Sequence, residues 1–264
     1  VLYTPHAFSY LSTENKLKKF LYVAIEKVLR TKNTIILATS NSEKNQAIQV
    51  VGYDKKKVFT LKNAIDKRSI GEDKDLEKTL KSKTYICTVG RPSFQKNLEM
   101  MIGAFEIVSK NNNKVHLFII GAGEYSPRKA KIVNMINKKN LNTRVTILPW
   151  VSRKEVQTYI KNAMLYVSSS RYEGMPYSVI ESMALSIPSV LTNTDGNRDL
   201  VIDKISGYLV EIGDYVEMAN KIMNLLNKSE LRKKLAFEAN KLFMQNHLLS
   251  NYMQNLTAHY QKHS

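Results

Sequence analysis

Short apolar segments alternate with helical segments over more than half of the chain, and this alternation limits the folds open to it. Strands and helices that alternate in this way form a parallel sheet with helices on both faces. We therefore predict an α/β fold. The predicted strands are 84–89, 115–120, 145–148, 165–168, 189–192 and 207–210, and the predicted helices between them are 97–110, 127–139, 153–161 and 177–185.

The residues before this region predict a smaller and less regular unit. A broad apolar stripe on its first helix favours a core helix with a lysine-rich outer face. A helix that faces a membrane is the alternative. The predicted elements are a helix over 12–30 capped by Ser12, a strand over 34–39, a helix over 41–51 and a strand over 58–61.

Charge and residue types exclude several classes of protein. The 264 residues carry a formal net charge of +17, which fits a solvated lysine-rich surface as well as a surface that binds anions. No nucleic-acid-binding motif accompanies this charge, so no nucleic-acid partner is expected. Cys87 is the only cysteine and the five histidines lack zinc spacing, so neither a disulfide nor a metal site is expected.

Ligands of parallel sheets bind at the carboxyl ends of the strands, so the loops that follow the predicted strands are the first places to search. One of these loops begins with Gly90, which permits close backbone approach, and carries Arg91 and Lys96 beside a helix start. Two cations near a helix N-terminus suit a diphosphate. The alternative is an ordinary solvated pair, which is the commoner role of isolated cations.

A second loop carries Gly121 and Gly123 directly after a predicted strand. The pair is half of a dinucleotide-binding fingerprint, but Ser126 stands where the third glycine belongs. No acidic residue is well placed after a second strand to hold the ribose of a dinucleotide. We interpret the two glycines as a tight turn near a ligand and do not expect NAD.

The most informative loop joins a predicted strand to a predicted helix. Glu173 follows the strand, Gly174 makes the turn, and Pro176 suits the first turn of the helix. Glu181 lies farther into that helix, where its side chain can still point toward the carboxyl ends of the strands. The amides of Gly174 to Tyr177 are predicted to point at an anion, and the carboxylates suit the hydroxyl groups of a ribose or hexose.

Several segments, taken in order, resemble the family 4 glycosyltransferases of the GT-B fold. EGMPYSVIE resembles the E-x7-E signature of that family, and TVGRPSFQKN resembles its phosphate-binding loop. The resemblance runs from about Tyr3 to about Glu211, and it departs from the family at Ala64, where a glycine is usual. The other matching segments are YTPHAFSY, LKNAID, FIIGAGE, ILPWVSRKEV and SVLTNTDGNRDLVIDKISGYLV.

The resemblance implies transfer of a sugar from a nucleotide-sugar donor, most often UDP-linked, with retention of configuration and without a metal or other cofactor. It implies that Arg91 and Lys96 neutralise the diphosphate and that Glu181 holds the ribose. Glu173 and His6 would act at the donor hexose. The residues implied to bind the donor are Gly90, Gly121, Gly123, Trp150, Val151, Gly174, Met175, Pro176, Tyr177 and Glu181.

The resemblance also sets the expected domains, because a GT-B enzyme has two Rossmann-like domains of similar size. Residues 1–66 are expected to be the C-terminal remnant of the acceptor-side domain, and 67–83 a charged linker. Residues 84–240 are expected to bind the donor, and 241–264 to form a helix that packs back toward the first domain. A non-catalytic nucleotide-sugar-binding subunit or an inactive fragment remains the alternative to an enzyme.

Partners and location follow from the same resemblance and from the composition. The expected partners are a nucleotide-sugar, a saccharide or lipid-linked acceptor, and an anionic membrane surface that attracts the basic chain. No apolar run reaches the roughly 18 residues of a membrane span. With one cysteine, the chain fits a reducing compartment. We expect a cytoplasmic protein, with peripheral attachment to the inner face of the membrane.

Overall fold

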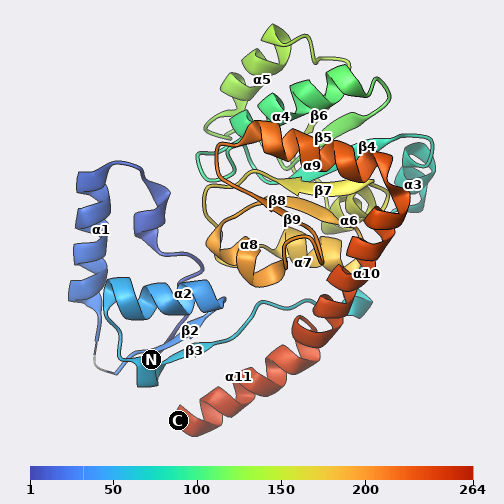
Figure 1. Cartoon of the computed structure of the whole chain (residues 1–264). Helices are drawn as coiled ribbons and strands as arrows, with labels where there is room; N and C mark the ends of the chain where they lie inside the picture. The colour runs from blue at the N-terminus through green and yellow to red at the C-terminus, as the bar shows by residue number, and fades with distance from the viewer. Residues whose placement is uncertain (32, 264) are drawn as a thin grey trace.

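The computed structural model describes residues 1–31 and 33–263, and these form two parallel sheets of unequal size (Figure 1). The smaller sheet has the order β1–β2–β3, and the larger has the order β6–β5–β4–β7–β8–β9. The strands are β1 (Leu2–Tyr3), β2 (Ile35–Ala38), β3 (Val58–Thr60), β4 (Tyr85–Val89), β5 (His116–Ile120), β6 (Val145–Leu148), β7 (Leu165–Ser168), β8 (Ser189–Thr192) and β9 (Tyr208–Val210).

The order of the larger sheet reverses at its centre, because the chain runs outward from β4 through β5 to β6 and then returns to β7 on the other side of β4. In open parallel sheets the ligand crevice lies at such a reversal, beyond the carboxyl ends of the strands. The fold therefore points to the loops that follow β4 and β7.

Helices cover both faces of the larger sheet, and each face has its own apolar core. On one face lie α4 (Leu98–Asn111), α5 (Lys129–Lys138) and α9 (Tyr215–Asn227). On the other face lie α3 (Lys74–Leu80), α6 (Arg153–Lys161), α7 (Tyr177–Ala184), α8 (Asp195–Leu200) and α10 (Ser229–Asn246). The predicted α/β layering is confirmed.

The charged segment 67–83 is more ordered than a linker. Its helix α3 begins where the Asp73 carboxylate accepts the backbone N–H groups of the first turn, and it ends at Leu80, which is buried in the core. The N–H groups of Gly71 and Asp73 donate to Gln157 and Thr158 of α6. A few buried contacts therefore fix a segment whose composition indicated exposure.

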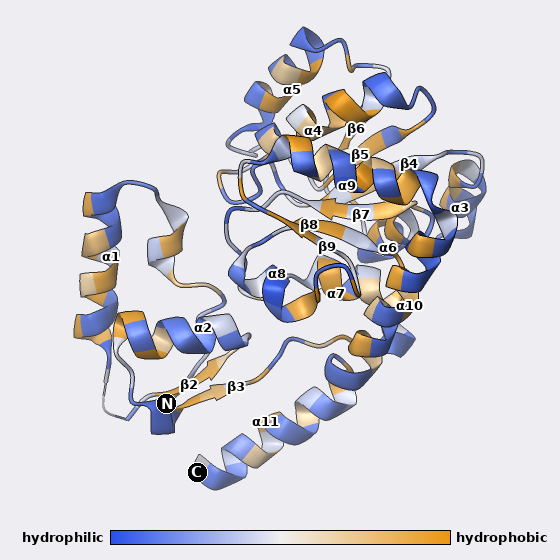
Figure 2. Ribbon diagram, viewed as in Figure 1, coloured by the Kyte–Doolittle hydropathy of each residue, from blue (hydrophilic) through white to orange (hydrophobic). Residues whose placement is uncertain are grey.

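The first helix departs from its prediction at both its cap and its packing. Helix α1 (Lys16–Leu29) is capped by Asn15, whereas Ser12 belongs to a preceding 3-10 turn at Ser9–Ser12. No residue of α1 is fully buried, but Tyr22 and Val23 pack against the core of the smaller sheet. Other apolar residues recur along the helix (Figure 2), and Leu17, Phe20 and Val28 among them are exposed. The preferred core position therefore holds for one narrow side of α1 and is wrong for the rest of its apolar stripe.

The C-terminal helices connect the two sheets (Figure 1). Helix α10 runs through residue 241, where a domain boundary was expected, and α11 (Leu249–His263) continues toward the smaller sheet. There the ring of His259 lies 4.8 Å from that of Phe59 on β3. None of the helices in the described ranges is long and apolar enough to cross a bilayer.

Candidate functional site

Two adjoining cavities open at the carboxyl ends of the larger sheet. The smaller, of about 340 Å³, is lined from both parts of the chain by residues that include His6, Lys96 and Glu173. The larger, of about 780 Å³, is lined by residues that include Trp150 and Glu181. Tyr177 lines both cavities, so they form neighbouring parts of one site.

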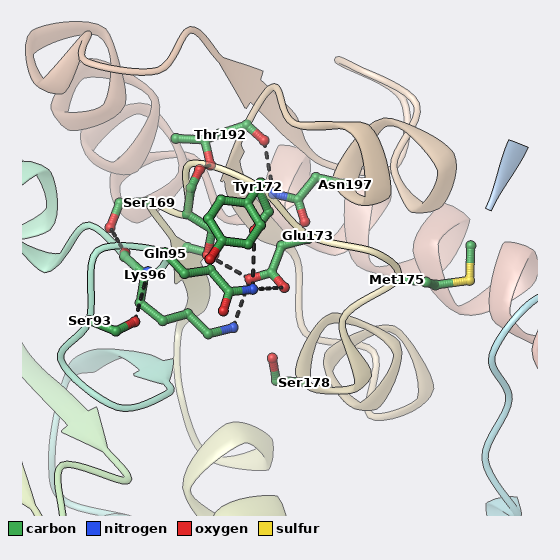
Figure 3. Close-up of polar contacts among 12 residues, drawn as sticks. Ser93, Gln95, Lys96, Ser169, Tyr172, Glu173, Met175, Ser178, Thr192 and Asn197 are labelled. Atoms are coloured by element: carbon green, nitrogen blue, oxygen red, sulfur yellow. Dashed lines mark hydrogen bonds and ion pairs between the residues drawn. The ribbon is translucent and has the colours of Figure 1, made fainter. Parts of the chain in front are cut away.

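Glu173 is the centre of a polar cluster in the smaller cavity (Figure 3). Its carboxylate lies 2.7 Å from Lys96 Nζ, accepts a 2.7 Å hydrogen bond from Ser170 Oγ, and accepts a weaker 3.3 Å bond from Gln95 Nε2. The residue is only 7% exposed. A buried carboxylate is tolerated when it is paired and hydrogen-bonded in this way.

The loop after β4 is shaped to bring Lys96 to this cluster. Gly90 has φ +146°, and a Cβ at this position would lie 2.8 Å from Lys96 Cε, so the lysine stem occupies the space above the glycine. Ser169 Oγ lies 3.0 Å from the carbonyl oxygen of Lys96 (Figure 3) and 2.9 Å from that of Asn97, so its single hydroxyl proton is shared between the two. The loops after β4 and β7 are thereby tied together.

Glu181 lies on α7 and faces the larger cavity. Its Oε1 accepts 3.2 Å hydrogen bonds from Arg153 Nε and Gln157 Nε2. Gln157 is 1% exposed, and its side-chain oxygen also accepts the N–H of Gly71. The carboxylate is thus held in place from α6, while its partner Arg153 remains largely exposed.

The glycine loop after β5 supports the exposed indole of the larger cavity. Trp150 is 72% exposed, and a Cβ at Gly123 would lie 2.3 Å from its Nε1 atom. Gly121 has φ +94°, and its N–H reaches the carbonyl oxygens of Leu148 and Pro149. The two glycines therefore form a tight turn, and the second one gives the indole its room.

The start of α7 differs in detail from its prediction. Pro176 is the capping residue rather than a residue of the first turn, and as a proline it has no N–H to offer an anion. Its carbonyl accepts from Val179 and Ile180, while the helix supplies no acceptor for the N–H groups of Tyr177 and Ser178. Of the N–H groups expected to face an anion between Gly174 and Tyr177, the one at residue 176 does not exist.

His6 reaches the smaller cavity from the other side. It has φ +53° and the next residue, Ala7, has φ +82°. A Cβ at Gly174 would lie 3.1 Å from backbone atoms of both. His6 therefore lines the same cavity as Glu173 and Lys96, whereas the exposed Arg91 lines neither cavity. Of the other predicted residues, Gly90, Gly174, Met175 and Pro176 line the smaller cavity, and Val151 lines the larger.

Several residues of the site were not predicted from the sequence. Ser170 and Gln95 donate hydrogen bonds to the Glu173 carboxylate, and Gln157 donates one to Glu181. Asn63 lines the smaller cavity and donates to the carbonyl of Met175 at 2.8 Å. Gln95 and Asn63 lie in the matching segments TVGRPSFQKN and LKNAID, but those matches did not indicate their contacts.

Gly196 is expected to tolerate no side chain. Its N–H donates to the carbonyl of Glu173, and a Cβ would lie 2.4 Å from the carbonyl oxygen of Gly174. Because that contact is with backbone, Gly196→Ala should destabilise the fold by about 1–3 kcal/mol. Thermal unfolding measures this against Gly71→Ala, whose Cβ meets only the flexible Lys154. Equal melting temperatures for the two variants would contradict the predicted clash.

Comparisons with known proteins indicate the family of this chain. The family model described as glycosyl transferases group 1 matches residues 70–242. A UDP-Gal:alpha-D-GlcNAc-diphosphoundecaprenol alpha-1,3-galactosyltransferase of Escherichia coli is 25% identical over 87% of this chain and 62% of its own length. A poly(ribitol-phosphate) alpha-N-acetylglucosaminyltransferase of Staphylococcus aureus is 29% identical over 71% of this chain and 36% of its own.

Solved structures share the fold. Sucrose-phosphate synthase of Thermosynechococcus elongatus superposes with a TM-score of 0.87 at 18% identity, covering 99% of this chain and 67% of that one. The Anabaena protein HepE, in complex with UDP-glucose, gives 0.84 at 18% identity, covering 99% and 72%. The GT-B-like fold expected from the sequence is therefore confirmed. Because the family model spans more than half of its residues, this chain belongs to the group 1 glycosyl transferases.

Proposed function

We propose that this chain holds the donor of a glycosyltransferase that moves a hexose from a UDP-linked sugar to a saccharide or lipid-linked acceptor with retention of configuration. The observation that carries the proposal is the pair of cavities joined at Tyr177, with Glu181 in one and Lys96 beside Glu173 in the other. A nucleoside fits the larger cavity, and a diphosphate with its sugar fits the smaller.

Each part of the donor has a partner of suitable chemistry. The ribose hydroxyls donate to the Glu181 carboxylate, and the uracil stacks on Trp150, whose exposed indole lines the same cavity. The diphosphate lies between Lys96 Nζ and the first N–H groups of α7, because both favour negative charge. Glu173 and His6 face the sugar from opposite sides of the smaller cavity.

The chemistry proposed for these residues is electrostatic. As the bond between sugar and phosphate breaks, negative charge grows on the diphosphate, and fixed positive groups stabilise it. Lys96 and the N–H groups of α7 supply such groups directly. Arg91, which is exposed and lines neither cavity, adds its positive charge from outside them. We propose that they do so without a metal ion, and that Glu173 orients Lys96 as well as the hexose.

The relatives support the acceptor class and the pathway. The E. coli relative is named as a galactosyltransferase of a lipid diphosphate, and another S. aureus relative as a glycosyltransferase of capsular polysaccharide biosynthesis. We propose that the whole protein acts in polysaccharide or glycoconjugate biosynthesis. A non-catalytic nucleotide-sugar-binding subunit is not favoured, because the relatives with assigned activities are named as transferases.

Calorimetry with free nucleotides tests the donor assignment. UDP should bind with 1:1 stoichiometry and about tenfold or more tightly than GDP or ADP, as the proposed UDP-linked donor requires. The titration is repeated in EDTA, which should leave the UDP affinity unchanged. Absence of binding by all three nucleotides would overturn the proposal. Loss of UDP binding in EDTA would overturn the metal-free part alone.

Retention is tested separately by following the anomeric proton of the product by NMR. The chain is mixed with a UDP-α-hexose and an undecaprenyl diphosphate saccharide. We expect an α-linked product from the start of the reaction, before any equilibration. A β-linked product would show inversion and would remove the retaining mechanism while leaving the donor site in place.

We also propose that α1 contacts the inner face of an anionic membrane, where lipid-linked acceptors would lie. Leu17, Phe20 and Val28 are each more than 70% exposed, and lysines lie on the same helix. Apolar residues flanked by lysines are typical of helices that lie in the lipid interface. The charge draws the helix to anionic headgroups, and the apolar side chains enter the lipid.

Vesicle binding tests this use of α1. The double variant Phe20→Glu/Val28→Glu should lower binding to phosphatidylglycerol vesicles by about tenfold or more, because each buried apolar side chain contributes about 1.5–3 kcal/mol. Phe237→Glu/Val216→Glu is the matched control, since both residues are exposed outside α1 and the change in net charge is the same. Equal binding by the two double variants would remove α1 from the membrane contact.

A further inference from the structure

Glu43 is a buried carboxylate that is not among the residues predicted for the site from the sequence. It lies on α2 (Asn41–Gln46), beside the smaller sheet, and is 2% exposed. Its Oε1 accepts the N–H of Ala7 at 2.5 Å, and its Oε2 accepts the N–H and Oγ1–H of Thr39 at 2.6 and 2.9 Å. Within residues 1–31 and 33–263 it forms no salt bridge, so backbone and hydroxyl donors alone satisfy it.

Helix capping does not account for this arrangement. A glutamate at the third position of a helix ordinarily returns to the N–H of the capping residue. Ser40 is the cap of α2 and accepts the N–H of Glu43, but the Glu43 carboxylate reaches past it to Thr39 and to Ala7. Burial of a charge is costly, so the three bonds outside the cap, and the distant one to Ala7 above all, need another reason.

The segment that Glu43 holds is a strained one. His6 and Ala7 are both in the left-handed region, with φ +53° and +82°, and neither is glycine. Such a conformation costs about 1–3 kcal/mol per residue unless the surroundings impose it. Here one side of the segment is fixed by Glu43 and the other rests on Gly174. The segment carries His6 into the smaller cavity.

The helix that carries Glu43 is itself attached to the larger sheet's helices. The Asp199 carboxylate on α8 accepts the N–H groups of Asn41 and Ser42 at 3.2 and 3.0 Å. Gln46 also donates to Asp195 of α8. An unbroken set of hydrogen bonds therefore runs from α8 through α2 and Glu43 to Ala7. Glu43 fixes the His6 segment relative to the same part of the chain that carries Glu173.

We propose that Glu43 is a positioning residue of the donor site, which acts on the sugar end of the donor through His6 and does not touch the donor itself. The identity of the ligand rests on the function proposed above, but the placement of His6 does not. UDP lacks the hexose, which is the part of the donor that His6 is proposed to face. Glu43 should therefore matter for a UDP-hexose and not for UDP.

The test is a double-mutant cycle of Glu43→Gln and His6→Ala. Glutamine keeps the size of Glu43 but has one acceptor oxygen, so it cannot serve both Ala7 and Thr39. Either single variant should weaken UDP-hexose binding by about tenfold and leave UDP binding within about twofold, and the double variant should lose no more than either single one. Additive losses, or an equal loss for UDP, would overturn the proposal.

A second readout does not depend on nucleotide binding. In chain labelled with ¹³C-histidine, the His6 signal is identified by its loss in His6→Ala. Glu43→Gln should move that signal and leave those of His116 and His247 unchanged; an unmoved His6 signal would overturn the proposal. If Glu43→Gln does not fold, Glu43→Asp takes its place, because it keeps the charge but is too short to span both partners. Failure of the unmodified chain to bind UDP would overturn the proposed function and leave this result standing.

Discussion

Replacement of Lys96 by alanine is expected to reduce sugar transfer by about 100-fold or more, because the leaving diphosphate loses a fixed cation. The same change leaves Glu173 buried beside Ser170 and Gln95 only, so the free energy of unfolding should also fall, by about 3 kcal/mol. Transfer is measured by release of UDP, and stability by urea unfolding.

Two further variants separate the two effects of Lys96. Lys96→Ala/Glu173→Gln removes the buried charge, so it should regain much of the lost stability without regaining transfer. Lys110→Ala is the control for a simple loss of charge, because Lys110 is an exposed partner of Glu106, and it should cost about 0.5 kcal/mol or less. Full transfer activity in Lys96→Ala would contradict the assigned role.

Replacement of Glu181 by alanine is expected to weaken UDP binding by about 100-fold, because two hydrogen bonds from ribose hydroxyls to a carboxylate are lost. Trp150 reports the binding directly. It is the only tryptophan of the chain, and it lines the same cavity as Glu181. Its fluorescence should change on titration with UDP and saturate at a far higher UDP concentration in Glu181→Ala.

Two control variants accompany Glu181→Ala, one at an unrelated carboxylate and one at a neighbour of Glu181. Glu230→Ala removes a carboxylate whose side chain is exposed, and it should titrate as the unmodified chain does. Arg153→Ala removes a partner that competes with ribose for Glu181, and it should not weaken UDP binding beyond about threefold. Unchanged saturation in Glu181→Ala would remove this residue from the ribose site.

The strands of the larger sheet could be predicted closely from the sequence, and the reason is physical. Parallel strands covered on both faces are continuous apolar runs, so their ends are visible where polar residues begin. Helix α3 was not predicted because charged residues dominate it, and it is held by Leu80 and by hydrogen bonds between the preceding residues and α6. Helix α8 was not predicted because it is short, and it is held by the burial of Leu200 and by contacts with α2. These contacts are not visible in the local sequence.

The environment of α1 could not be predicted, because the same apolar stripe serves a core helix and a surface helix equally well. Amphipathic periodicity identifies the face of a helix and says nothing about what covers it. In the described residues Tyr22 and Val23 pack against the core of the smaller sheet, whereas Leu17, Phe20 and Val28 are exposed. Which part of the stripe is covered depends on the neighbouring elements and not on the stripe itself.

The members of the site could be predicted more readily than their contacts. Lys96 and Glu173 were each expected to face a ligand, and the structure shows that they also face each other at 2.7 Å. The sequence did not single out Glu43, because a serine followed three residues later by a glutamate, as in Ser40 and Glu43, is the ordinary pattern of a helix start. Pairings between residues far apart in the chain depend on the fold, and local patterns do not encode them.

The structure of the chain bound to UDP is the most direct test of the donor site. We predict the uracil on Trp150, the ribose hydroxyls within hydrogen-bonding distance of Glu181, and the diphosphate between Lys96 and the start of α7. That placement would explain why Glu173 and Glu181 flank one helix N-terminus. A UDP bound elsewhere, for example in the hollow beside Tyr53 of the smaller sheet, would contradict the account.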